Sequence, residues 1–205
     1  THTAAVACQT CHIPFFAKNE PTKMRWDWST AGEKRPETKD EYGKSTFMNK
    51  KGSFVWQKNV PPQYAWYNGS ADAYMAGDKI DPKGVVKLTY PLGNIGDAKA
   101  KIYPFKVHTG KQIYDTKHNI IITPKTYGEG GYWDKYDWDL AADLGMKANA
   151  TMVEKGLSYS GQHDFVETEM WWRINHMVSP KDQALQCNDC HNKGQRLDWK
   201  ALGYD

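Results

Sequence analysis

The chain has 205 residues, with 27 Lys and Arg against 24 Asp and Glu and a formal net charge of +3. So small a net charge argues against a protein that coats nucleic acid. The mean hydropathy of −0.78, without an apolar run of roughly 18 residues, argues against a membrane-spanning helix. Nine Trp, 12 Tyr and 6 Phe stand against only eight Leu. Something besides aliphatic side chains must therefore supply buried apolar surface.

Two C-x-x-C-H motifs stand near opposite ends of the chain, and no signal peptide precedes the first, as expected of a mature or truncated chain. Their residues are Cys8, Cys11 and His12 in one motif and Cys187, Cys190 and His191 in the other. This pattern attaches c-type haem, because the two thiols reach the two vinyl groups of one porphyrin and the adjacent imidazole faces the iron. The sequence predicts two covalent haems and leaves no cysteine for a structural disulfide.

Three other uses of the cysteines compete with haem. A four-cysteine zinc site would leave both adjacent histidines to chance, which happens roughly once in a thousand such chains. Disulfides across C-x-x-C are typical of redox motifs in βαβ units, and no such unit is visible. Free dithiols are hard to maintain outside the cytosol. Haem is therefore favoured.

An aromatic-rich insert, at about residues 13–163, separates the motifs within a single domain of residues 1–205. Short runs of strand-like composition lie at residues 52–57, 63–68, 85–90, 102–108 and 119–123. The first two flank a five-residue turn and predict a hairpin. The predicted fold class is a multihaem cytochrome c, mainly irregular, with a few α-helices around the haems and short β-strands in the insert.

Three segments have helical patterns. Residues 137–148 carry Leu140 and Leu144 at helical spacing, with Asp residues in the first turn. Residues 164–178 place Trp172 and other rings along one stripe, and a proline follows. A short helix is expected over residues 180–185, capped by the preceding serine.

Each motif histidine leaves one coordination position of its iron to another residue. His176 is the first candidate, since the predicted helix places it beside Trp172. His108 ends a predicted strand and is the second. His2 lies six residues before Cys8, and we expect it to ligate a haem of another chain or of a missing segment. The sequence context of His118 and His163 indicates loop residues.

Two features concern charge. The acidic stretch 134–139 is a candidate Ca²⁺ site, although helix capping and solvated charge are commoner uses of such residues. Two haems with ionised propionates would bring the net charge of +3 close to neutral. Steering toward a redox partner would then depend on local patches of charge.

Several stretches together resemble one family, the octahaem c-type cytochromes of the tetrathionate reductase type. They are residues 7–14, 21–24, 26–32, 77–82, 100–108, 175–180, 185–191 and 196–199. The likeness is to the C-terminal, two-haem part of that family. It implies a periplasmic protein, haem attachment at both motifs, and axial roles for His108 and His176. The lysine-ligated catalytic haem of the family lies in the part missing here, so the resemblance assigns no catalytic residue.

These observations favour an electron-transfer protein with two bis-His haems, in the periplasm or outside the cell. A first alternative is the C-terminal part of a multihaem reductase of sulfur or nitrogen oxyanions, which needs an open iron face. A second is a subunit of a polymeric haem chain, in which His2 ligates a haem of the next copy. The expected partners are redox proteins, with further copies of the chain in the last case.

Overall fold

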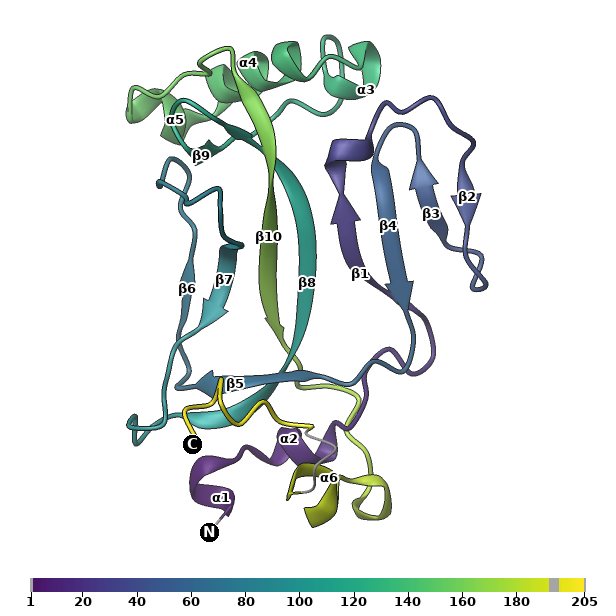
Figure 1. Ribbon diagram of the computed structural model, residues 1–205, viewed down its shortest axis with the longest axis vertical. Helices are drawn as coiled ribbons and strands as arrows, with labels where there is room; N and C mark the ends of the chain where they lie inside the picture. Colours follow the sequence, from purple (N-terminus) through teal and green to yellow (C-terminus); the bar gives the residue numbers. More distant parts are fainter. Residues whose placement is uncertain (1, 192–195, 205) are drawn as a thin grey trace.

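A long mixed β-sheet organises the molecule (Figure 1). The computed structural model describes residues 2–191 and 196–204. In this part of the chain, ten strands form one sheet in the order β2-β3-β4-β1-β8-β10-β7-β6, and β5 and β9 also pair with β8. The strands are β1 (Thr22–Asp27), β2 (Thr38–Lys39), β3 (Ser45–Met48), β4 (Gly52–Gln57), β5 (Gln63–Tyr67), β6 (Ala71–Ala73), β7 (Val86–Pro91), β8 (Lys101–Asp115), β9 (Ile120–Ile121) and β10 (His163–Arg173).

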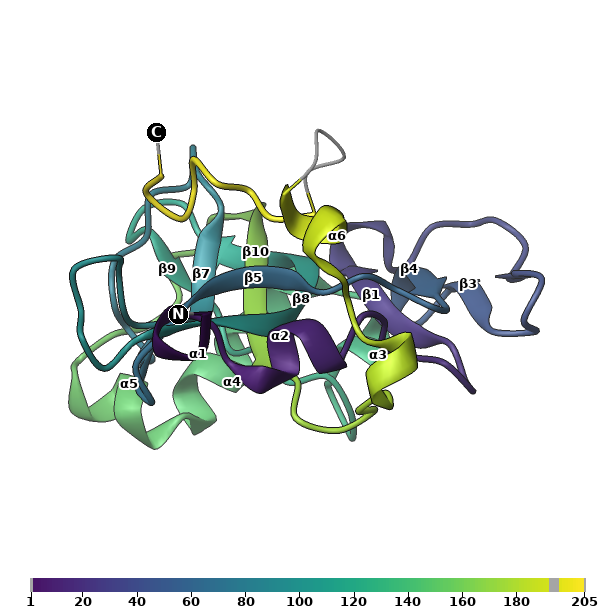
Figure 2. The same cartoon turned by 90° about the horizontal axis from the view of Figure 1, so that it is seen from below.

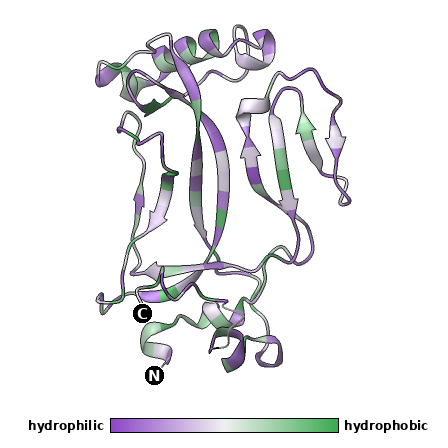
Figure 3. Ribbon diagram, in the orientation of Figure 1, coloured by the Kyte–Doolittle hydropathy of each residue, from purple (hydrophilic) through white to green (hydrophobic). Residues whose placement is uncertain are grey.

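β8 and β10 form the centre of the sheet. They pair antiparallel from His163 opposite Asp115 to Arg173 opposite Phe105. β1 pairs in parallel with the outer edge of β8. On the other side, β7 pairs in parallel with the outer edge of β10. Hydrophobic and hydrophilic positions are interleaved along these strands (Figure 3), as expected where side chains alternate between two faces. β8 thereby links one end of the molecule to the other.

Three helices cover one end of the sheet (Figure 1). They are α3 (Tyr132–Lys135), α4 (Trp138–Ala148) and α5 (Ala150–Glu154). The Asp137 carboxylate accepts a hydrogen bond from the Leu140 N–H and so caps α4. Ala142 and Met146 of α4 are fully buried in a cluster with the isoleucines of β8 and β9. The predicted helix at residues 137–148 is confirmed.

The two C-x-x-C-H motifs lie together at the opposite end, below β5 and β8 (Figure 1), and their helices face the viewer when the molecule is seen from below (Figure 2). The short elements there are α1 (His2–Ala5), α2 (Cys8–His12), the 3₁₀ turn η2 (Lys181–Gln183) and α6 (Cys187–His191). Both ends of the described chain lie nearby (Figure 1). No helix in the described ranges is long and apolar enough to cross a membrane.

The structure corrects the predicted helix at residues 164–178. This segment is strand β10 up to Arg173, followed by an irregular connection. Its rings fit a helical stripe, but its β-branched and aromatic residues also suit a strand, and the long pairing with β8 decides the outcome. The short helix expected after Ser179 is only the 3₁₀ turn η2.

The structure also corrects the predicted hairpin and the mainly irregular fold. β4 and β5 both exist, but β4 pairs with β1 and β3, whereas β5 pairs with β8. The prediction at residues 102–108 captures only part of β8, which runs for 15 residues. Long-range pairing therefore gives the insert a continuous sheet.

Candidate haem site

The first motif helix is anchored to the start of β8. The Thr10 hydroxyl donates a hydrogen bond of 2.7 Å to the Ile102 carbonyl, and the Ala7 N–H donates one of 3.0 Å to the same oxygen. Thr10 is buried, which leaves Cys8 and Cys11 on the outer side of a single helical turn. The role of Thr10 was not predicted from the sequence, although its position between the two cysteines of the motif could have drawn attention to it.

The segment before the second motif runs along the first. The Leu185 N–H donates to the Cys11 carbonyl at 3.0 Å, and the Ser179 N–H donates to the His12 carbonyl at 2.7 Å. Residues separated by almost the whole chain are thus joined by backbone hydrogen bonds. Ser179, expected as a helix cap, instead holds the first motif in place.

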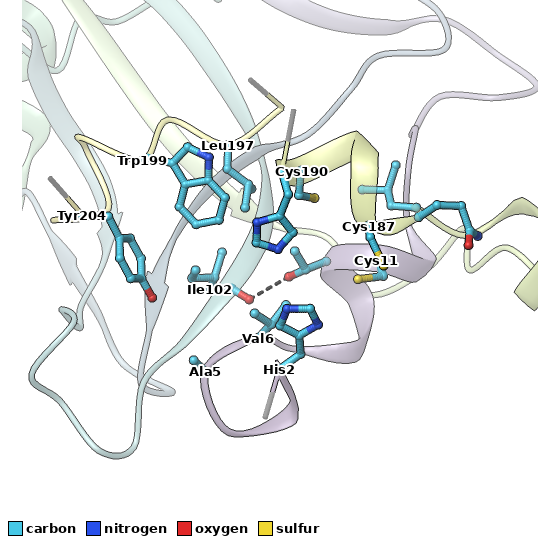
Figure 4. Close-up of a pocket in the computed structure, with 14 residues that line it drawn as sticks. His2, Ala5, Val6, Cys11, Ile102, Cys187, Cys190, Leu197, Trp199 and Tyr204 are labelled. Carbon is cyan, nitrogen blue, oxygen red and sulfur yellow. Dashed lines mark hydrogen bonds between the residues drawn. The ribbon is translucent and has the colours of Figure 1, made fainter. Parts of the chain in front are cut away.

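The two pairs of thiols lie next to each other. All four cysteines are free, and Figure 4 shows Cys11 and Cys187 side by side. Burial raises the pKa of the Cys11 thiol, and the neighbouring Cys8 and Cys187 raise it further. Burial, followed by the charge of Cys11, likewise raises the pKa of Cys190. No disulfide joins them.

The arrangement of these cysteines does not support the zinc alternative. Within residues 2–191 and 196–204, no group of three or more His, Cys, Asp or Glu side chains is placed to hold a metal ion. Structural zinc sites need four such ligands around one point. The described geometry therefore offers two adjacent thiol pairs in place of a tetrahedral cluster.

An apolar cavity of about 440 Å³ lies between the motifs (Figure 4). It is lined by Cys11, Cys187, Cys190 and both His2 and His191, with a wall formed by Ala5, Val6, Ile102, Leu185, Leu197, Trp199 and Tyr204. Cofactor pockets are usually about 300–1,000 Å³, mostly apolar, with a few polar groups. Thiols and imidazoles at the edge of an apolar space fit the chemistry of covalently attached haem.

The ring of His191 lies between two other rings. The His2 imidazole is nearly parallel to it, at 5.7 Å between ring centroids and 14° between planes. Trp199 lies at 5.6 Å and 24°. Metal–nitrogen bonds of about 2.0 Å place the centroids of two imidazoles about 6 Å apart when they ligate one metal from opposite sides. The separation of His2 and His191 is close to this distance, but the two rings are stacked, so at least one of them must turn to point a nitrogen at a shared metal.

The ring of His12 is oriented by its own hydrogen bond. Its Nδ1–H donates to the Ser179 carbonyl at 3.1 Å, since a carbonyl oxygen can only accept. This tautomer leaves the Nε2 lone pair free, as a metal ligand requires. Lys18 Nζ donates to the Ser179 hydroxyl at 2.6 Å and steadies the same residue.

Neither His176 nor His108 lines the cavity between the motifs. His176 is exposed after the end of β10 and lines a different cavity, of about 480 Å³. His108 lies six residues along β8 from Ile102, roughly 20 Å at the rise of a strand. Its Nε2 is buried without a hydrogen-bond partner, and burial lowers its pKa to about 4. Their predicted ligand roles receive no geometric support here.

The other two histidines, His118 and His163, lie beside carboxylates at the end of the sheet that is opposite the motifs. His118 lies 3.4 Å from the buried Asp115 carboxylate in the turn after β8. His163 begins β10, where the sequence indicated a loop, and its Nδ1 lies 2.9 Å from Asp139. Neither His118 nor His163 lines the cavity between the motifs.

The candidate Ca²⁺ stretch is used for local structure. Asp134 accepts a hydrogen bond from the Gly130 N–H, Asp137 caps α4, and Asp139 lies beside His163. No carboxylate cluster suited to a cation exists in the described ranges. The structure therefore gives this prediction no support.

Sequence reasoning also missed most of the cavity wall. Ile102, Leu197, Trp199 and Tyr204 come from β8 and from the segment after the second motif. Leu197 and Trp199 lie within a stretch that resembles the octahaem family, which was the available signal. Their role becomes clear only when the chain ends are brought together.

Paired C-x-x-C-H helices at an apolar cavity define a haem protein of the c type. Residues 23–194 match the family described as bacterial cytochrome c, and the chain belongs to that family. Covalent haem c is thus its cofactor, and the resemblance to multihaem c-type cytochromes is confirmed.

One solved structure gives a close comparison. An octaheme cytochrome c from Shewanella oneidensis is 76% identical, with a TM-score of 0.97. The match covers 100% of this chain but 47% of that chain, so the present sequence spans about half the length of its relative. No protein with a curated description matches significantly.

Proposed function

We propose that this chain holds two covalent haems side by side and transfers electrons between redox partners. The observation that carries the proposal is the meeting of the two motifs, joined by the hydrogen bond from Leu185 to Cys11. Haem supplies reversible one-electron exchange, whereas the protein supplies attachment, orientation and an apolar environment. The backbone contact between the first motif and the segment just before the second would hold the two groups within short reach.

We assign the axial positions from the ring geometry. His12 and His191 would be the ligands within the motifs, and His2 would hold the iron of His191 as its second histidine. This assignment makes His2 an intrachain ligand. It therefore replaces the hypothesis of a polymeric haem chain, which required His2 to reach a neighbouring copy.

The surroundings would adjust the reduction potential. The apolar wall around His191, including Trp199, disfavours the charge of oxidised iron, and the Ser179 carbonyl on His12 makes that imidazole more basic. The two haems therefore have different environments. We expect two distinguishable reduction potentials.

A reductase function is the second candidate. It is favoured by the match to 47% of a longer octaheme chain, which leaves room for catalytic parts outside this sequence. It requires an iron with an open face. The intrachain pair of His2 and His191 would instead leave one iron without an open face.

Spectroscopic redox titration under carbon monoxide tests the proposal. We expect two reversible one-electron steps and little carbon monoxide binding at the haem of His191. A stoichiometric carbon monoxide adduct at the haem of His191 would contradict electron transfer through a closed site and favour the reductase.

We also propose a location outside the cytoplasm, in the periplasm or beyond the cell. The resemblance to periplasmic multihaem cytochromes supports it, as does the use of every cysteine in a haem motif. Fractionation of the native host tests this location. Recovery of the haem protein with the cytoplasm would overturn it.

A further inference from the structure

A second cavity, of about 570 Å³, lies beside the cavity between the motifs. Tyr64, Trp66 and Leu202 line this second cavity. They pack in one buried cluster with Ile102 and Leu197, which line the cavity between the motifs. One cluster of packed side chains therefore forms a wall of both cavities. We call the second one the side cavity.

Aromatic rings connect the second motif to the side cavity. The ring of His191 stacks on that of Trp199 at 5.6 Å between centroids. Trp199 contacts Tyr204 at 5.3 Å, and Tyr204 contacts Trp66 at 6.3 Å. All three separations lie within the range of about 4.5–7 Å that is usual for paired rings. A molecule in the side cavity would therefore contact the last ring of a continuous path from His191.

Two further rings line the side cavity and remain partly exposed. Tyr90 of β7 and Trp171 of β10 meet edge to face, at 5.0 Å between centroids and 75° between planes. The indole N–H of Trp171 already donates to the Glu169 carboxylate at 3.1 Å. The ring of Trp171 therefore offers apolar surface to a ligand. Partly exposed rings in a concave site suit a flat aromatic molecule, which can stack on them.

The charged side chains of the side cavity balance one another. Lys87 and Arg196 are cationic, whereas Glu169 and Asp198 are anionic. A lining without net charge favours an uncharged ligand. The cationic groups can donate hydrogen bonds to carbonyl oxygens, and the carboxylates can accept them from hydroxyl groups. A ligand whose oxygens change between carbonyl and hydroxyl would find partners in both forms.

We propose that the side cavity binds a quinone and that the haems exchange electrons with it there, a redox step that rests on the proposed electron-transfer function. When the quinone is reduced, two ferrous haems give up one electron each and become ferric. The quinone takes up these two electrons and two protons from the solvent, and each of its two carbonyl oxygens becomes a hydroxyl. The reverse step delivers two electrons from the quinol to the haems.

Calorimetric titration of the oxidised, haem-loaded protein with menadione, a small naphthoquinone, tests binding without electron transfer. We expect one site per chain. Trp171→Leu should weaken menadione binding by about tenfold, because the ligand loses a ring on which to stack.

Trp172→Leu is the matched control. Trp172 is the next residue of β10, is exposed and does not line the side cavity. This variant loses the same side chain but should keep the affinity for menadione within about twofold of the wild type. Absence of menadione binding, or equal losses in the two variants, would overturn the proposal.

Rapid mixing of the fully reduced protein with excess menadione tests the electron transfer. We expect the rate of haem oxidation to reach a plateau as the menadione concentration rises, with half-saturation near the calorimetric dissociation constant. A rate that rises linearly without a plateau, or haems that stay reduced, would overturn the redox step. Redox titration of the same samples separates the two claims: two reversible haem steps without menadione binding would overturn this inference alone and leave the electron-transfer function in place.

Discussion

At the scale of single residues, the imidazoles of His2 and His191 carry the ligand assignment. His2 belongs to the short helix α1, and its ring lies 5.7 Å from that of His191 in the cavity between the motifs. The sequence located both residues but did not indicate that their rings lie side by side. Spacing along the chain could not show that residue 2 meets residue 191, because the contact depends on how both ends pack below β8.

Replacement of His2 tests that assignment. In His2→Ala, one of the two haems should change from low spin to high spin and bind carbon monoxide, because its iron loses one ligand. Visible and electron paramagnetic resonance spectra would measure the change, and added imidazole should reverse it.

His176→Ala is the comparison for His2→Ala, since His176 is exposed and does not line the cavity between the motifs. Its spectra should match the wild type. A low-spin His2→Ala protein together with a high-spin His176→Ala protein would reverse our ligand assignment in favour of the original sequence prediction.

Asp115 is a buried carboxylate that organises the end of β8. It accepts hydrogen bonds from the N–H groups of Lys117 and His118 and from both the N–H and the hydroxyl of Ser160. Asp115→Asn should lower the free energy of unfolding by about 1–3 kcal/mol, because the amide replaces an acceptor by a donor. Urea unfolding measures this loss, and Asp72→Asn on exposed β6 should change little.

The same carboxylate predicts a pH dependence. Burial raises the pKa of Asp115, but the hydrogen bonds outweigh it and the pKa lies below 3.8. Its contribution to stability is therefore complete above the unfolded pKa and is lost as the pH falls through the folded pKa. Urea unfolding in steps below pH 5 should show a smaller acid-induced loss in Asp115→Asn than in the wild type; identical profiles would contradict this role.

At the scale of elements, β10 shows where sequence patterns fail. Its alternating buried positions, Val166 and Thr168, coexist with rings at helical spacing, so both periods fit the same residues. Pairing with β8 over the whole strand favours the extended form. Helix α4 could be predicted because its capping residue Asp137 and the helical spacing of its apolar residues both indicate a helix over the same segment.

Close packing of α4 gives a further prediction. A Cβ at Gly145 would clash with the backbone of Thr123, Pro124 and Lys125. Gly145→Ala should therefore lower stability by about 1–3 kcal/mol, although alanine is the better helix former by about 1 kcal/mol. Thermal unfolding measures the change. Lys147→Ala, exposed on the same helix, should have a small effect, and a stabilised Gly145→Ala protein would contradict the packing described.

At the scale of the whole molecule, the sheet brings the two ends of the chain together. The motif sequences alone indicated the cofactor, its attachment and the class of protein, because C-x-x-C-H has few other uses. They did not indicate that the motifs share one cavity, which depends on β8 and on the hydrogen bonds around Cys11 and Ser179. The single insert is the scaffold that makes this meeting possible.

The central claim is that each motif carries one haem within this chain. Intact mass spectrometry of the denatured protein, together with a pyridine haemochrome assay, tests it most directly. We predict the mass of the chain plus two haems for the wild type, and plus one haem for Cys187→Ser/Cys190→Ser. A wild-type chain that carries no covalent haem, or only one, would contradict the account.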